Sequence, residues 1–179
     1  MRVLQERRAF APLRGRSCVR WAGLCASAVI AADQASKAAV VAKIRPGQEI
    51  DVILGVRLVR VSNRGMAFSL GNSRGSGVVV VVLVVVAALV WVVRRELARP
   101  PGEPGAATTA QAVAFGVILG GAIGNLVDRF LRHPGWGRGA VVDFVDTRIW
   151  PVFNVADAAL SLGGIALVVL AFRSSGQSA

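Results

Sequence analysis

Two acidic residues bracket the entrance to the last apolar segment of the chain. Asp143 lies just before this segment and Asp157 lies just inside it. A carboxylate at the mouth of a hydrocarbon-spanning helix is costly to desolvate, which makes it a functional candidate by default. Two nearby carboxyl groups cannot both ionise easily, so one keeps a proton while the other can activate water. The pair therefore predicts acid and base chemistry at a membrane surface.

Other polar residues recur at helical spacing inside apolar segments. Asp33 and Lys37 are four residues apart, acid first, so they share a helix face and can pair. A self-neutralising pair that reaches the membrane interface would explain this spacing equally well. Asn125 and Arg129 are also four apart, with Asp128 beside them. An arginine at a helix end commonly snorkels, but that does not explain Asn125 one turn deeper.

Two more asparagines complete the set of polar candidates. Asn154 lies three residues before Asp157, and we expect both on one face of the same helix. Asn63 followed by Gly65 is first of all a turn signal, which alone would explain these residues. The amides of Asn125 and Asn154 are donors that can hold the acids and a substrate carbonyl by hydrogen bonds.

The sequence contains none of the other common catalytic arrangements near these acids. Cys18 and Cys25 lie toward the opposite end of the first apolar segment, and His133 is the single histidine. These residues form neither a Ser–His or Cys–His pair nor a set of metal ligands. We therefore expect no metal and no cofactor.

The composition indicates an α-helical integral membrane protein. Hydrophobic residues make up 54% of the 179 residues, and the mean hydropathy is +0.59. A bilayer is crossed by roughly 20 apolar residues, and four segments are long enough: 21–43, 75–93, 106–130 and 152–172. A net charge of +11 would indicate nucleic-acid binding in a soluble domain. Here the arginines flank apolar segments, so we expect no nucleic-acid partner.

The chain divides into a basic arm, a four-span unit at 21–173 and a short tail at 174–179. Residues 1–20 contain six arginines and no apolar periodicity, which predicts a disordered cytoplasmic arm touching anionic lipid. This arm and the apolar run after it also resemble a cleavable secretory signal. Asp33 and Lys37 interrupt that run in a way that a signal does not need.

The regions between the spans are predicted from their turn residues and apolar runs. Ile50–Leu54 and Val56–Val61 predict two short strands on the membrane surface, within residues 44–74. A return loop is expected after the second span, from Arg94 onward. Residues 131–151 are expected to form a loop that carries Asp143, and Pro151 suits the start of the fourth span.

Glycines recur every fourth residue in the third span, at Gly116, Gly120 and Gly124. They leave one helix face bare, so another helix can approach closely. Because four spans alternate in direction, the polar candidates all fall at one membrane face. The arginines before the first span favour a cytoplasmic N-terminus. The polar candidates are then extracytoplasmic, and both termini are cytoplasmic.

Five short motifs in order resemble those of lipoprotein signal peptidase, also called signal peptidase II, the aspartic intramembrane peptidase family of bacteria. The resemblance covers about residues 21–172. It rests on Asp33-Gln34-x-Ser36-Lys37, Asn63-x-Gly65-x-Ala67-Phe68, Gly124-Asn125-x-x-Asp128-Arg129, Val142-Asp143-Phe144 and Phe153-Asn154-x-Ala156-Asp157.

The resemblance implies a fold, an activity and a set of site residues. It implies four transmembrane helices with a small extracytoplasmic β-cradle in the bacterial inner membrane. The implied enzyme cleaves diacylglyceryl-modified prolipoproteins before the lipidated cysteine. We also expect contact with membrane lipids and a monomeric protein. Asp143 and Asp157 would be the catalytic pair. The implied supporting residues are Asp33, Lys37, Asn63, Gly65, Asn125, Asp128, Arg129 and Asn154.

Two other classes of function compete with a peptidase. A small transporter would relay ions through the same buried charges. It would need polar residues that continue toward the other membrane face, and the second span and the inner halves of the others lack them. A purely structural membrane subunit would leave the one-sided clustering of acids unexplained.

Overall fold

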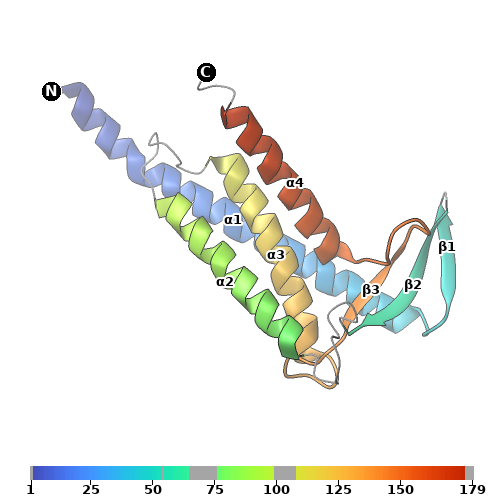
Figure 1. The fold of residues 1–179 in the computed structure, drawn as a ribbon. Helices are drawn as coiled ribbons and strands as arrows, with labels where there is room; N and C mark the ends of the chain where they lie inside the picture. Colours follow the sequence, from blue (N-terminus) through green and yellow to red (C-terminus); the bar gives the residue numbers. More distant parts are fainter. Residues whose placement is uncertain (1, 54, 65–75, 99–107, 176–179) are drawn as a thin grey trace.

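The computed structural model describes residues 2–53, 55–64, 76–98 and 108–175. These residues form a helical bundle with a small sheet at one end (Figure 1). In chain order the elements are α1 (Arg2–Lys43), β1 (Glu49–Ile53), β2 (Val56–Asn63), α2 (Ser76–Ala98), α3 (Thr109–Leu131), β3 (Val141–Asp146) and α4 (Val155–Ser175). The start of α1 and the end of α4 lie at the end of the bundle away from the sheet (Figure 1).

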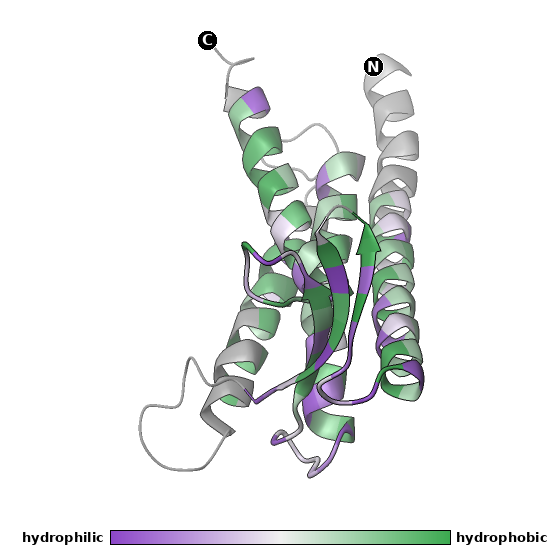
Figure 2. Ribbon diagram, turned by 90° about the vertical axis from the view of Figure 1, so that its right-hand side faces the viewer, coloured by the Kyte–Doolittle hydropathy of each residue, from purple (hydrophilic) through white to green (hydrophobic). Residues whose placement is uncertain are grey.

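Three helices in the described part of the chain are long and apolar enough to cross a membrane. They are Ser17–Lys43 within α1, Thr109–Leu131 and Val155–Arg173. These confirm the first, third and fourth predicted spans as membrane-span candidates. Figure 2 shows hydrophobic residues along the helices, and α4 exposes Leu162, Ile165 and Phe172. The crossing by α2 stays a prediction.

The helices differ from the predicted segments at several ends. The arm was predicted to be disordered, which is wrong: its backbone from Arg2 onward is helical and continues into the first span. A helix of 42 residues is about 63 Å long, roughly twice the hydrocarbon thickness. Also, α2 continues through Arg94 and Arg95, which were placed in the return loop. The rest of that loop, residues 99–107, lies outside the described residues.

The close approach of α3 to its neighbours confirms the role predicted for its glycines. A Cβ atom on Gly116 would collide with the backbone oxygen of Ala22 on α1, and one on Gly120 would lie 2.7 Å from the oxygen of Ala26. A Cβ on Gly124 would lie 2.7 Å from a carboxylate oxygen of Asp33. All three glycines therefore face α1, and α3 also packs against α2 and α4.

The sheet is antiparallel with the strand order β1-β2-β3. The first two strands confirm the predicted pair. The third corrects the prediction of a loop over 131–151, because Val141–Asp146 pairs with β2 and places Asp143 opposite Val61. Phe144 of β3 is buried with Val40 of α1 and with Ile44, which directly follows α1. This contact holds the sheet on the bundle.

The packing of α3 on α1 predicts different outcomes for alanine at two glycines. Gly116→Ala forces the two helices apart and should lower the free energy of unfolding by about 1–3 kcal/mol. Gly164→Ala is the matched control, because a Cβ there meets nothing within 4 Å. It should leave stability unchanged or raise it by up to about 1 kcal/mol through helix propensity. Thermal unfolding in detergent measures both, and equal effects would contradict this packing.

Candidate functional site

The polar cluster is the group of side chains that meets where the helices join the sheet. It comprises Asp33, Lys37, Asn63, Asn125, Asp128, Arg129, Asp143, Asn154 and Asp157. Its centre is Lys37, whose Nζ lies 2.8 Å from Oδ2 of Asp33, 2.9 Å from Oδ2 of Asp128 and 3.0 Å from Oδ1 of Asn125. Lys37, Asp33 and Asp128 are all 0% exposed. The ammonium group thus has an acceptor for each of its three protons.

The two carboxylates that bind Lys37 also connect it to other elements. Oδ1 of Asp33 accepts a hydrogen bond from the backbone N–H of Ala156 at 3.0 Å, which links α1 to α4. Oδ2 of Asp128 accepts one from the N–H of Val142 at 3.2 Å, which links α3 to β3. Oδ1 of Asp128 lies 2.6 Å from Nε of Arg132. The predicted pair of Asp33 and Lys37 is therefore confirmed as a buried pair, not one that reaches the interface.

Asp143 lies on β3 and is 3% exposed. Its Oδ2 accepts a hydrogen bond from Nδ2 of Asn63 at 3.0 Å, and its Oδ1 accepts one from Nδ2 of Asn154 at 2.7 Å. Burial raises the pKa of Asp143 above the ordinary aspartate value, and the charge of Asp157 adds to this rise. The two amide hydrogen bonds lower the pKa, but burial outweighs them.

Asp157 lies in the first turn of α4, where it forms a capping box with Asn154. Oδ1 of Asn154 accepts from the N–H of Asp157 at 3.0 Å, and Oδ2 of Asp157 accepts from the N–H of Asn154 at 3.2 Å. Asn154 was expected inside the helix, which is wrong: it is the residue before the first helical position, and α4 begins at Val155 and not near Pro151.

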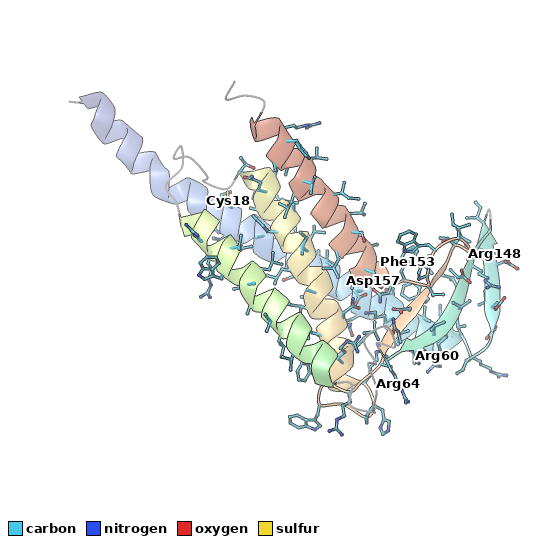
Figure 3. The ribbon with its side chains drawn as sticks, in the orientation of Figure 1. Cys18, Arg60, Arg64, Arg148, Phe153 and Asp157 are labelled. Carbon is cyan, nitrogen blue, oxygen red and sulfur yellow. The ribbon has the colours of Figure 1, made fainter. Side chains whose placement is uncertain are left out.

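The two acids are bridged by a chain of asparagine amides. Asn154, which donates to Asp143, also donates to Oδ1 of Asn125 at 3.3 Å. Nδ2 of Asn125 then donates to Oδ1 of Asp157 at 2.8 Å. Figure 3 shows Asp157 at the start of α4, beside the sheet. Side chains from a strand and a helix are in this way held in one hydrogen-bonded network.

The remaining predicted residues differ in how the structure places them. Arg129 is buried, 8% exposed, and interacts electrostatically with Asp143, Asp128 and Asp157. Gly65 lies outside the described residues. All the other predicted residues meet in the polar cluster.

Sequence reasoning missed two members of the surrounding network, Gln34 and Arg132. Nε2 of Gln34 donates to the backbone oxygen of Gly124 at 3.1 Å and lies 3.4 Å from Oδ1 of Asp128. Arg132, the residue that follows the last helical residue of α3, binds Asp128. The signal that could have found Arg132 is its spacing of four residues from Asp128, acid first. Gln34 stands beside Asp33 in the first of the five motifs, but it was not counted among the site residues.

The arrangement provides acid and base groups and hydrogen-bond donors. No group of three or more His, Cys, Asp or Glu side chains that could hold a metal ion occurs among the described residues. Asp143 and Asp157 are two carboxyl groups in different environments, one buried on a strand and one at a helix N-terminus. Burial raises the pKa of Asp143, and a carboxyl group that keeps its proton in this way can act as an acid.

Comparisons of the chain with known sequences agree on one family. A family model described as "Signal peptidase (SPase) II" matches residues 25–173. The lipoprotein signal peptidase of Streptomyces coelicolor is 40% identical over 166 residues, which cover 91% of this chain and 76% of that protein. Those of Rhodococcus jostii and Mycobacterium avium are 43% and 42% identical, covering 81% of this chain and 69% and 75% of theirs.

Two solved structures have a similar fold. Both are described as bacterial membrane enzymes determined by the in meso method. The one at 1.9 Å resolution has a TM-score of 0.68 and 26% identity, and the match covers 83% of this chain and 90% of that chain. The one at 2.3 Å has a TM-score of 0.70 and 24% identity, covering 88% and 91%. On the family match and these relatives, the chain belongs to the signal peptidase II family, the membrane proteases that remove the signal peptides of lipoproteins.

Proposed function

We propose that this protein is an aspartic endopeptidase of the bacterial inner membrane. It cleaves diacylglyceryl-modified prolipoproteins before the lipidated cysteine and releases the signal peptide. The observation that carries the proposal is the bridged pair: Asp143 and Asp157 come from different elements, and Asn154 and Asn125 connect them by hydrogen bonds. A hydrolase that uses two carboxyl groups needs this kind of fixed separation.

In the proposed resting state Asp143 keeps a proton and Asp157 is ionised. Burial raises the pKa of Asp143, which favours its neutral form. Asp157 lies in the first turn of α4, where the positive end of the helix dipole favours an anion. A charge count supports one shared proton: the cluster with Arg132 contains four carboxyl groups and three cations, and protonation of one carboxyl makes it neutral. The groups are Asp33, Asp128, Asp143, Asp157, Lys37, Arg129 and Arg132.

The reaction follows from these protonation states. The carboxylate of Asp157 takes a proton from water as the water oxygen attacks the scissile carbonyl carbon, while Asp143 donates its proton to the carbonyl oxygen. The tetrahedral intermediate then collapses. Its C–N bond breaks, the proton on Asp157 passes to the leaving amine of the cysteine, and the hydroxyl proton returns to Asp143. Both carboxyl groups end in their starting states.

The other polar residues hold the pair and do not react in this scheme. Asn63 and Asn154 fix the carboxyl group of Asp143, and Asn125 fixes that of Asp157. Arg129 balances the negative charge of the pair. The buried ion pairs that Lys37 forms with Asp33 and Asp128 support the amides, because Lys37 also donates to Asn125. Gly65 belongs to the same predicted set of supporting residues.

We further propose that α2 is the fourth transmembrane helix and that the protein acts as a monomer in lipid. The basic segment at 1–20 and the tail at 174–179 are then cytoplasmic, and the sheet is extracytoplasmic. This orientation puts the pair near the headgroup level of the outer leaflet. There the diacylglycerol of a substrate can stay in the bilayer while its peptide reaches the carboxyl groups.

The first test is cleavage of a diacylglyceryl-modified prolipoprotein by purified protein in detergent, followed by gel shift. Asp143→Asn and Asp157→Asn should each lower kcat by roughly 10²–10⁴-fold or more, since each removes a proton-transfer group. Glu49→Gln is the matched control, because Glu49 is an exposed carboxylate on β1. It should cleave like wild type. Cleavage that survives in a folded variant of either acid would remove that residue from the pair.

The second test uses the pH dependence of kcat. Asn63 donates to the carboxylate of Asp143 and thereby lowers its pKa. Asn63→Ala should raise this pKa, so Asp143 keeps its proton to higher pH and the basic limb of the profile moves upward. Ser62→Ala, the neighbouring change on β2, should leave the limb in place. A downward shift or no shift in Asn63→Ala would contradict Asp143 as the proton donor.

The third test concerns the ionic support. Lys37→Met leaves the buried carboxylates of Asp33 and Asp128 without their cation, which should cost about 3–5 kcal/mol of stability. Lys43→Met removes an exposed lysine from the same helix and should change stability little. Thermal unfolding in detergent compares the two. Equal stability would mean that the lysine is not needed to neutralise the cluster.

A further inference from the structure

The connection between β3 and α4 displays two large apolar side chains that the proposed site does not use. Ile149 is 92% exposed and Trp150 is 70% exposed. The neighbouring strand β1 adds Val52 and Ile53, which are 57% and 66% exposed. The salt bridge between Arg148 and Asp51, at 2.8 Å, ties this connection to β1. The four apolar residues therefore belong to linked segments on one part of the sheet.

The connection has a defined conformation. The backbone N–H of Arg148 donates to Oδ1 of Asp146 at 2.7 Å. Val145 and Phe153 exchange backbone hydrogen bonds at 2.8 and 3.1 Å, which closes the segment at its base. Arg148 has a φ of 64°, a left-handed conformation that a residue with a side chain adopts at a cost and only when its surroundings impose it. These hydrogen bonds and this backbone conformation hold Ile149 and Trp150 in their exposed positions.

The connection leads along the chain into α4, whose outer face is apolar. This helix exposes Leu162, Ile165 and Phe172 and is a candidate membrane span. Figure 3 shows Arg148 beside β1, and Phe153 and Asp157 where α4 begins. After Trp150 comes Pro151, which has no N–H group and so leaves no backbone donor there to be satisfied by water. Trp is the residue most typical of the membrane–water boundary, because its ring is apolar and its N–H is polar.

We propose that Ile149 and Trp150 insert into the headgroup region of the bilayer. The occupant of this surface is phospholipid of the leaflet on the side of the polar cluster. Because the connection joins the strand of Asp143 to the helix of Asp157, the anchor sets the depth of both carboxyl groups relative to the lipid headgroups. The lipid contact does not depend on the proposed catalysis and is measured without it.

The test is fluorescence quenching of single-tryptophan proteins in phosphatidylcholine vesicles with bromine at defined depths of the acyl chain. One protein keeps Trp150, with Trp21, Trp91 and Trp136 changed to Phe. The matched control keeps Trp136, which is 92% exposed in the loop at the other end of β3. Trp150 should be quenched more strongly by shallow than by deep bromines, and Trp136 should be quenched weakly by both.

Each other outcome overturns the proposal. Weak lipid quenching of Trp150 together with strong quenching by aqueous acrylamide places the connection in water. Lipid quenching of Trp150 that disappears on adding a lipidated prolipoprotein assigns the surface to the substrate. Protection of Trp150 from both quenchers that increases with the protein-to-lipid ratio assigns the surface to a second copy. If the triple Phe variant does not fold, a nitroxide at Trp150→Cys, with Cys18 and Cys25 changed to Ser, gives the same depth from its collision rates with oxygen and a water-soluble nickel complex.

Discussion

The structure depends on the neutralisation of one buried lysine. Lys37 is fully buried, and an uncompensated ammonium group there would cost several kcal/mol. Asp33 and Asp128 provide the opposite charges, and each carboxylate uses its other bonds to hold a further element. Through them α1 is tied to α3, to α4 by the N–H of Ala156 and to β3 by the N–H of Val142. The ionic centre thus fixes the elements that carry Asp143 and Asp157.

The small residues of α3 serve the same centre. Gly116 and Gly120 allow α1 to approach along the apolar part of the bundle, and the next glycine in the series, Gly124, lies against the carboxylate of Asp33. A larger side chain there would occupy the space of the ion pair. Close helix packing and charge neutralisation are therefore parts of one arrangement, since the short side chain of Asp33 reaches the neighbouring elements only when α1 and α3 lie this near.

The proposed catalytic pair shows how ordinary structural devices can set acid and base roles. Asp157 is the third helical residue of α4 and belongs to a capping box with Asn154. The start of the helix thus provides the backbone N–H of Asn154 as a hydrogen-bond donor and a dipole that favours a negative charge. Asp143 lies on a buried strand, where desolvation favours its neutral form. Asn154 serves both, since its oxygen caps α4 and its nitrogen binds Asp143. These positions support the two proposed roles.

The sequence by itself determined the apolar segments, the small face of α3 and the first two strands, because these follow from local residue patterns. It also determined that the polar residues gather at one end, because consecutive spans alternate in direction. It did not reveal β3, whose partner strand lies about 80 residues earlier, or the place of Asn154 before α4. Nor did it distinguish a snorkelling Asp33–Lys37 pair from a buried one. Only the tertiary structure decided these points, because burial and long-range hydrogen bonds depend on which elements meet.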